Sequence, residues 1–229
     1  MLNHLRATGC AIRLITNAAS RHPDKLCAHL RNIGIHFEPE EIICSGSLLS
    51  SANLDLKIQS ALHLGRDEAL CFLETAGITG TLFPDEPTVI ISSAFSKDDP
   101  LLHPAEELLR MPGAKLVVLN PDAWAPKMDG SRMPVSGSLA WTLHQKTSCQ
   151  TVFLGKPFPQ IFQTALRSLP AEIGPAIMIG DTLGTDILGG QVAGLATALM
   201  LGGNSSWESL QEDEMSLGIS PDYYLDGLR

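Results

Sequence analysis

The sequence predicts a doubly wound α/β fold, in which helices cover both faces of a parallel sheet. Short apolar segments of strand type alternate along the chain with segments of helical periodicity. The strand-type segments are apolar throughout rather than at every second position, which is typical of strands buried on both faces. With 229 residues, of which 44% are hydrophobic, the chain can also fill a sizeable core.

The expected elements follow one another in this alternating order. Pro23 can occupy the first turn of a helix that ends at Gly34, and a second helix follows Pro159. A third helix opens near Thr185, directly after an apolar run. The predicted strands span residues 11–16, 89–95, 115–119, 151–154, 176–180 and 195–201.

The middle of the chain differs in composition from its two ends. Between residues 57 and 148 the sequence holds more Pro, Asp and Gly, its strands are separated by longer loops, and it has a βα rhythm of its own. This change predicts an inserted domain. We therefore expect a core formed by residues 1–56 and 149–229, split by an α/β cap of residues 57–148.

Composition excludes several classes of function. The formal net charge is -9 and the 16 Lys and Arg residues are scattered, which argues against a nucleic-acid surface. No apolar run has the length of a membrane span, and the first residues are too polar for a secretory signal. The 5 cysteines are widely spaced and form no CxxC pair, as expected of reduced core residues. We expect a cytoplasmic protein whose partners are small molecules rather than nucleic acids or membranes.

Candidate functional residues follow the predicted strands, because ligands of open α/β sheets bind beyond the carboxyl ends of the strands. Thr16 and Asn17 follow the first strand, Lys156 follows the strand at 151–154, and Asp181 with Asp186 follows the strand at 176–180. Two aspartates around a strand-to-helix turn suit Mg2+, which takes one or two protein carboxylates and completes its octahedral shell with water and phosphate.

Each of these residues also has an ordinary structural interpretation. Asp181 and Asp186 can simply favour the positive amino-terminal end of a helix. Lys156 can neutralise a transferring phosphoryl group or be a solvated lysine. Thr16 can offer a hydroxyl and an amide to a phosphate or only form a turn. The individual residues leave these alternatives open.

The order and spacing of the motifs is more specific. The segments LITN (14–17), GKPFPQIFQTAL (155–166) and MIGDTLGTDILGGQVAGLATALML (178–201) resemble motifs II, III and IV of the haloacid dehalogenase superfamily of phosphohydrolases. RNIGIHFEPEEIICSG (31–46), NPDAWAPKMDG (120–130) and VSGSLAWTL (135–143) are similar to its class IIA branch, which includes p-nitrophenyl, phosphoglycolate, sugar and nucleotide phosphatases. The resemblance covers nearly the whole chain, and the inserted segment lies where this branch carries its cap.

The resemblance implies a Mg2+-dependent hydrolysis of a small phosphate ester. Thr16 and Asn17 would bind the phosphoryl oxygens, and Lys156 would stabilise the nucleophile and the developing charge. Asp181 would hold Mg2+ with support from Asp186. In the cap, Asn120 and Asp122 are candidates for contacting the substrate, although an Asn-Pro turn explains the same residues. Relatives of this branch often pair through their caps, so a homodimer is compatible with the resemblance and the oligomeric state stays open.

The sequence departs from the family at motif I, the first core strand, which carries the attacking aspartate and the acid/base aspartate two residues later. No aspartate precedes Thr16. The segment KMDGS at 127–131 has Lys127 in the place of the nucleophile and follows no apolar strand, so we reject it. Three explanations remain: an N-terminally truncated and inactive phosphatase, a non-catalytic phosphometabolite-binding or regulatory module, or a strand supplied by a partner. We prefer the first, because motifs II to IV are intact.

Overall fold

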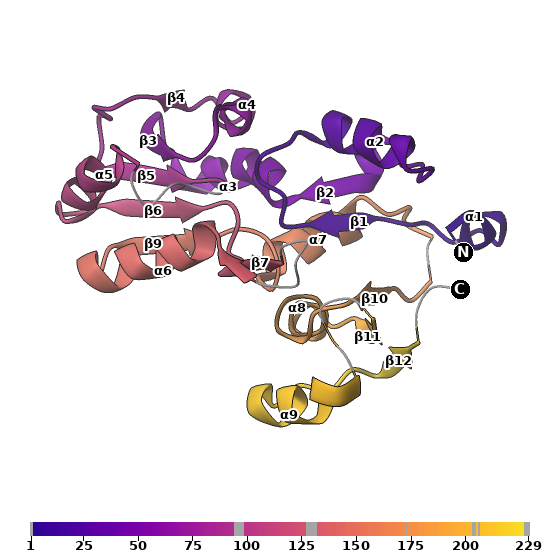
Figure 1. Cartoon of the computed structure of the whole chain (residues 1–229). Helices are drawn as coiled ribbons and strands as arrows, with labels where there is room; N and C mark the ends of the chain where they lie inside the picture. The colour runs from indigo at the N-terminus through magenta and orange to yellow at the C-terminus, as the bar shows by residue number, and fades with distance from the viewer. Residues whose placement is uncertain are drawn as a thin grey trace. The chain divides into compact units, whose positions relative to one another are not determined.

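A computed structural model describes residues 2–93, 99–126, 132–172, 174–202, 205 and 207–226 (Figure 1). The rejected segment at 127–131 lies outside these residues. The predicted α/β class with parallel sheets is confirmed. The chain forms two compact units, residues 15–155 and residues 1–14 with 156–229, and each is described by itself.

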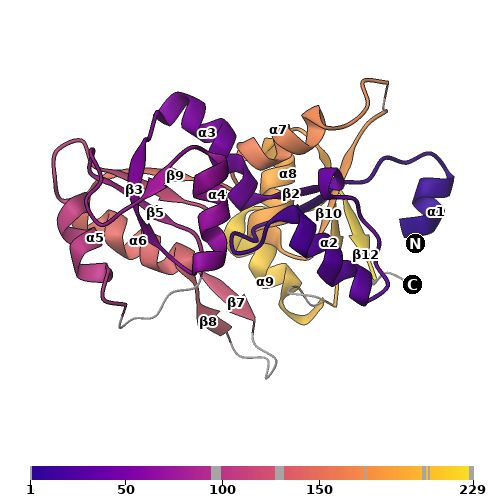
Figure 2. The ribbon, with the colours of Figure 1, turned by 90° about the horizontal axis from the view of Figure 1, so that it is seen from above.

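The unit of residues 15–155 is built on a five-stranded sheet with the strand order β4-β3-β5-β6-β9. All of its strand pairs are parallel, and Figure 2 shows the sheet beside α5 and α6. The chain runs outward from β3 to β4, returns to β5 on the other side of β3, and continues outward to β9. The strands are β3 (Ser60–Leu64), β4 (Thr79–Gly80), β5 (Thr88–Ile91), β6 (Lys115–Val118) and β9 (Gln150–Phe153).

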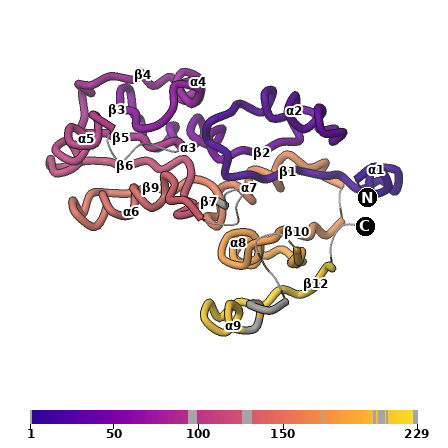
Figure 3. The backbone as a smooth tube through the Cα atoms, viewed as in Figure 1, coloured from indigo at the N-terminus to yellow at the C-terminus, as the bar shows by residue number. Residues whose placement is uncertain are grey.

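Helices α5 and α6 pack on one face of this sheet. Because successive side chains of a strand point to opposite faces, Leu62, Leu64 and Ile91 contact these helices, whereas His63 and Ile90 point to the other face. Figure 3 shows β6, β9 and α6 next to one another. The remaining elements here are α3 (Leu48–Leu56), a 3-10 turn (Asp67–Ala69), α4 (Leu70–Thr75), α5 (Leu102–Leu109), β7 (Trp124–Pro126), β8 (Arg132–Pro134) and α6 (Ser136–Thr147).

The first part of the chain adds a separate pair of strands, β1 (Leu14–Thr16) and β2 (Ile42–Cys44). Helix α2 (Pro23–Asn32) begins with a proline at its first turn, as predicted, and connects the two strands. Two 3-10 turns, Pro39–Glu41 and Ser45–Ser47, flank β2. The carboxyl end of β1 brings Thr16 and Asn17 to the start of the connection to α2.

The unit of residues 1–14 and 156–229 holds a parallel three-stranded sheet with the order β10-β11-β12. Its core joins the turn after β10, the end of β11 and α9 through buried leucine and isoleucine side chains. None of the helices in the described ranges is long and apolar enough to cross a membrane. The elements are α1 (Leu2–Ala7), α7 (Pro159–Arg167), β10 (Ile177–Gly180), a π-helical turn (Leu183–Ile187), α8 (Leu188–Val192), β11 (Ala196–Met200), α9 (Trp207–Leu217) and β12 (Tyr223–Leu225).

Strand pairing differs from the expected domain limits at β9. This strand was expected in the core of residues 149–229, but it is hydrogen-bonded to β6 and extends the five-stranded sheet. Its sequence fits either place, because both sheets are parallel and take apolar strands. The two units also divide the chain at residues 14/15 and 155/156. The cap limits at 57 and 148 stay a prediction.

Strand β10 is an edge strand among the described residues, where it pairs with β11 alone. Its side chains alternate in burial: Met178 is 8% exposed, whereas Ile177 and Ile179 are 46% and 39% exposed. The apolar sequence of β10 predicts a strand buried on both faces, but one of its apolar faces is exposed to solvent.

Candidate active site

Asp181 and Asp186 lie on either side of the turn that follows β10. The backbone amides of Asp181 and Thr182 donate to Asp186 Oδ2, with N···O distances of 3.1 and 3.2 Å. The amide of Asp186 in turn donates to the carbonyl of Thr182 at 2.9 Å, within the π-helical turn. The Asp186 carboxylate is thus folded back over the end of its own strand and fixes the shape of the turn.

Gly180 makes this close approach possible. A Cβ atom at position 180 would lie 2.3 Å from both Cβ and Cγ of Asp186, far inside normal contact distance. The last residue of β10 must therefore lack a side chain for Asp186 to reach the amides of the turn.

Lys156 is the third charged residue near this turn, and it is the first residue of the segment 156–229. Its Nζ lies 2.7 Å from Asp186 Oδ1, and the two side chains are only 15% and 5% exposed. Apart from this ion pair, Asp186 Oδ1 has no hydrogen-bond donor in the described part of the chain. The buried carboxylate therefore depends on the lysine for compensation of its charge.

The Asp181 carboxylate is the candidate metal ligand of this cluster. It is partly exposed, and its Oδ1 accepts a hydrogen bond from the Thr182 hydroxyl at 3.1 Å. Oxygen donors of this kind fit a hard cation such as Mg2+, which needs few protein carboxylates. Both oxygens of Asp186 are already occupied by amides and by Lys156, so this residue fits a supporting role. Over the residues that the structure describes, no group of three or more His, Cys, Asp or Glu side chains could hold a metal by itself.

The other expected site residues gather in the unit of residues 15–155. Asn17 Nδ2 donates to Asp122 Oδ1 at 2.8 Å, although 105 positions separate the two residues. Asn120 Oδ1 accepts the Asp122 amide at 2.9 Å and so shapes the turn after β6. Thr16 Oγ1 accepts the amide of Ala18 at 3.2 Å. This set joins the end of β1 to the carboxyl edge of the five-stranded sheet.

Gly155 follows β9, and its backbone lies beside Asn17 of the same set. Its φ of +97° suits glycine, and an added Cβ would lie 2.6 Å from Asn17 Oδ1. Asn17 itself is only 7% exposed, so its amide is held rigidly between Asp122 and the Gly155 backbone. A buried, oriented amide at a strand end is suited to a hydrogen bond with an anionic oxygen.

The expected residues are therefore brought together as two groups. Lys156 and the two aspartates after β10 form one group, and Thr16, Asn17, Asn120 and Asp122 belong to the other. Two supporting residues were not identified from the sequence as part of the site. The Thr182 hydroxyl donates to Asp181 Oδ1 at 3.1 Å, and the buried Ser205 hydroxyl donates to the Asp181 carbonyl at 2.8 Å. The sequence signal for Thr182 was its position next to Asp181. The signal for Ser205 was its position in the loop after β11, the next strand of the sheet.

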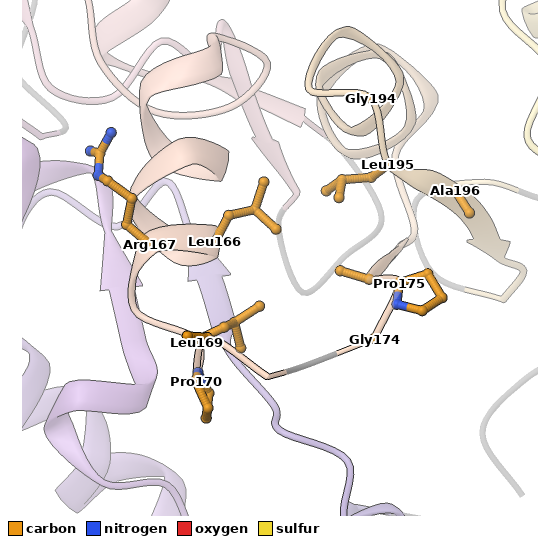
Figure 4. Close-up of a pocket in the computed structure, with 11 residues that line it drawn as sticks. Leu166, Arg167, Leu169, Pro170, Gly174, Pro175, Gly194, Leu195 and Ala196 are labelled. Atoms are coloured by element: carbon orange, nitrogen blue, oxygen red, sulfur yellow. The ribbon is translucent and has the colours of Figure 1, made fainter.

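A pocket of about 610 Å³ lies at the opposite edge of the β10–β11 sheet, next to the amino ends of the strands (Figure 4). Leu166 and Leu195 contribute apolar walls. Among the described residues that line this pocket, Arg167 is the charged one. Its guanidinium donates to Thr164 Oγ1 at 3.1 Å. The lining contains none of the candidate site residues, so this pocket plays no part in the site.

Two family models match the chain at its two ends. A haloacid dehalogenase-like hydrolase model matches residues 1–79, and a HAD-hydrolase-like model matches residues 153–229. The matched segments contain LITN in the first case and the motifs around Lys156 and Asp181 in the second.

Curated proteins and solved structures with similar sequences agree with these models. Chronophin of Bos taurus is 37% identical over 123 residues, which are 52% of this chain and 41% of that protein, so the match spans less than half of the relative. Dihydroxyacetone phosphatase of Corynebacterium glutamicum is 28% identical over 89% of this chain and 74% of its own. The structure of a possible sugar phosphatase from Cytophaga hutchinsonii superposes with a TM-score of 0.86 at 26% identity, covering 98% of this chain and 84% of that one.

Proposed function

The chain belongs to the haloacid dehalogenase superfamily, in its class IIA branch, and we propose that its residues form the phosphate- and Mg2+-binding part of a phosphomonoesterase. The main support for this proposal is the cluster of Lys156, Asp181 and Asp186 around the end of β10. A phosphatase of this kind needs a cation and a carboxylate-held metal near the phosphoryl group to compensate its negative charge. The relatives named for dihydroxyacetone phosphate and sugar phosphates support a small, hydroxylated phosphate ester as the ligand.

The division of roles follows from the contacts. Lys156 supplies a positive charge that Asp186 holds in place, and the partly exposed Asp181 supplies an oxygen ligand for Mg2+. When bound, Mg2+ would neutralise phosphoryl oxygens and orient the ester. Asn17 and Thr16 would offer the side-chain amide and hydroxyl, or nearby backbone N–H groups, to phosphoryl oxygens. Asn17 is kept in its orientation by Asp122.

The nucleophile is the part that these 229 residues do not supply in the expected place. Asp24 is the first aspartate in the sequence, and it lies within α2 after the phosphate-binding loop at Thr16 and Asn17. We therefore propose that the chain as given binds phosphate but does not hydrolyse esters at a rate typical of the family. The same observation favours the second candidate function, a non-catalytic phosphometabolite-binding or regulatory module.

Two measurements on the purified chain test this proposal. Thermal unfolding with Mg2+ and inorganic phosphate or vanadate should show stabilisation that requires both components and is lost in Asp181→Asn. Arg167→Ala is a matched control, because that residue lies outside the cluster. The absence of stabilisation in a chain that folds cooperatively would contradict the binding role.

Turnover of p-nitrophenyl phosphate with Mg2+ separates the two candidate functions from an active enzyme. We expect rates near the uncatalysed background. Clear turnover that disappears in Lys156→Ala or Asp181→Ala would show that a nucleophile lies within the 229 residues and would overturn this account. Recovery of turnover on addition of a polypeptide that carries an aspartate-bearing strand would favour the enzyme over the binding module.

A further inference from the structure

The five-stranded sheet has its own place where a ligand is expected. Its strand order reverses between β3 and β5, because the chain leaves β3 toward β4 on one side and continues from β5 toward β9 on the other. In open parallel sheets, ligands bind beyond the carboxyl ends of the strands at such a reversal. The residues at this position are His63 near the end of β3, Gly65 and Arg66 directly after it, and Ser92 and Ser93 after β5.

These residues form a polar cluster in an otherwise apolar sheet. His63 Nε2 lies 2.7 Å from the Oγ of Ser92, which is completely buried. The Ser93 hydroxyl, 6% exposed, accepts the backbone amide of Arg66 at 3.0 Å. Polar groups are costly to bury without hydrogen bonds. In this cluster the hydrogen bonds hold His63 against Ser92 and the Arg66 amide against Ser93.

Two hydrogen-bonding functions of this cluster remain without a partner among the residues that the structure describes. His63 uses Nε2 for Ser92, and its Nδ1 makes no hydrogen bond there. Ser93 accepts a bond from Arg66, and its hydroxyl hydrogen has no acceptor there. His63 is partly exposed, so a ligand can reach its ring. The hydrogen bond to the buried Ser92 fixes the orientation of that ring.

The local charges select the kind of ligand. Burial lowers the pKa of His63 and so favours the neutral imidazole, although the carboxylates of Asp67 and Asp99 oppose that shift. A neutral ring near two carboxylates is a poor site for a phosphoryl group, but it can donate or accept a hydrogen bond with a hydroxyl group. The Ser93 hydroxyl has the same property. Both groups therefore match the neutral, hydroxyl-bearing part of a small molecule.

We propose that His63 and Ser93 bind the hydroxylated organic group of the ligand, with Ser92 as the residue that positions His63. This inference rests on the proposed function for the identity of the ligand as a phosphate ester, because it assigns the recognition of the alcohol portion. The cluster belongs to the same unit and the same edge of the sheet as Asn120 and Asp122. The site would thereby discriminate hydroxylated esters from simple aryl esters.

The first test is a titration of the isotope-labelled chain followed by the imidazole resonances of its histidines. Ribose, as a neutral polyhydroxyl probe, and ribose 5-phosphate should both shift the His63 ring signals in a saturable way. His144 is the matched control, because its Nδ1 also contacts a hydroxyl, that of Thr151 at 2.9 Å, within the same unit. Absence of a saturable shift at His63, or equal shifts at His144, would overturn the proposal.

The second test compares affinities by calorimetry. His63→Leu and Ser93→Ala should each weaken ribose 5-phosphate about 3- to 10-fold, as expected for the loss of one neutral hydrogen bond, and leave inorganic phosphate unchanged. His144→Leu should change neither. Equal weakening of both probes in His63→Leu would show a structural role only. Should that variant unfold, the titration of the unmodified chain still decides.

Failure of this inference and failure of the proposed function give different results. Phosphate binding that depends on Asp181, without any response of His63 to ribose, would reject the inference and keep the function. A saturable response of His63 to ribose in a chain that binds no phosphate would reject the function and leave a sugar-binding site of unassigned role.

Discussion

Lys156 and Asp186 form a buried ion pair in which Nζ lies 2.7 Å from Oδ1. The second oxygen of the same carboxylate accepts two backbone amides of the turn after β10. One side chain therefore connects the lysine of one motif with the loop that carries Asp181. This connection makes stability and ligand binding depend on the same contacts.

Replacing Lys156 with Ala should destabilise the unit that contains it. The substitution leaves the Asp186 carboxylate buried without its cation, and we expect a loss of about 2–4 kcal/mol in the free energy of unfolding. Urea unfolding followed by circular dichroism measures it. Lys146→Ala is the control, because that lysine is 53% exposed, bridges Glu106 at 3.1 Å, and should change stability by less than about 1 kcal/mol. Equal effects of the two variants would contradict the role of the buried pair.

Gly180→Ala should displace Asp186 from the turn. The added methyl group would overlap Cβ and Cγ of Asp186, so we expect a cost of about 1–3 kcal/mol together with weaker Mg2+-dependent phosphate binding. Gly184→Ala provides the comparison, since nothing lies within 4 Å of its added Cβ and alanine favours helical backbone. Chemical denaturation and thermal shift measure both effects. A Gly180→Ala variant as stable as Gly184→Ala would refute the steric explanation.

His63 should make the stability of the chain sensitive to mild acid. Burial lowers its folded-state pKa below the ordinary value of about 6.5, so the unfolded chain binds more protons in the interval between the two values. The free energy of unfolding should therefore fall as the pH drops below about 6.5. His63→Gln should flatten this part of the pH profile, measured by urea unfolding at a series of pH values. An unchanged slope in His63→Gln would contradict the assignment.

The open face of β10 should promote self-association. Ile177 and Ile179 expose apolar surface on a strand whose second edge carries no strand among the described residues, and such edges are templates for pairing with other chains. The double variant Ile177→Thr with Ile179→Thr should reduce concentration-dependent association in sedimentation velocity. Val192→Thr removes a similarly exposed side chain, 62% exposed on α8, and should have little effect. Association that persists unchanged in the double variant would exclude this edge.

Sequence periodicity located much of the fold. The predicted strands at 115–119, 151–154, 176–180 and 195–201 agree closely with β6, β9, β10 and β11, because continuous apolar runs are a strong signal of parallel strands. Strand β3 was missed. Its sequence, Ser60–Leu64, is interrupted by serine and histidine, and these polar residues are accommodated through hydrogen bonds to Asp85 and Ser92 that no local pattern reveals.

Residue types and their order along the chain were sufficient to select the candidate site and the family. They identified Thr16, Asn17, Lys156 and both aspartates as residues at strand ends, since the chemistry of phosphate and Mg2+ binding limits which side chains can serve. The family resemblance assigned Mg2+ to Asp181 and a supporting role to Asp186, but the residue types by themselves gave no physical reason for that division. The reason comes from the tertiary structure: the turn after β10 folds Asp186 onto Gly180 and against Lys156, which leaves Asp181 as the more accessible carboxylate. The contact of Asn17 with Asp122 across 105 residues was decided in the same way, by the packing of strands that are distant in the sequence.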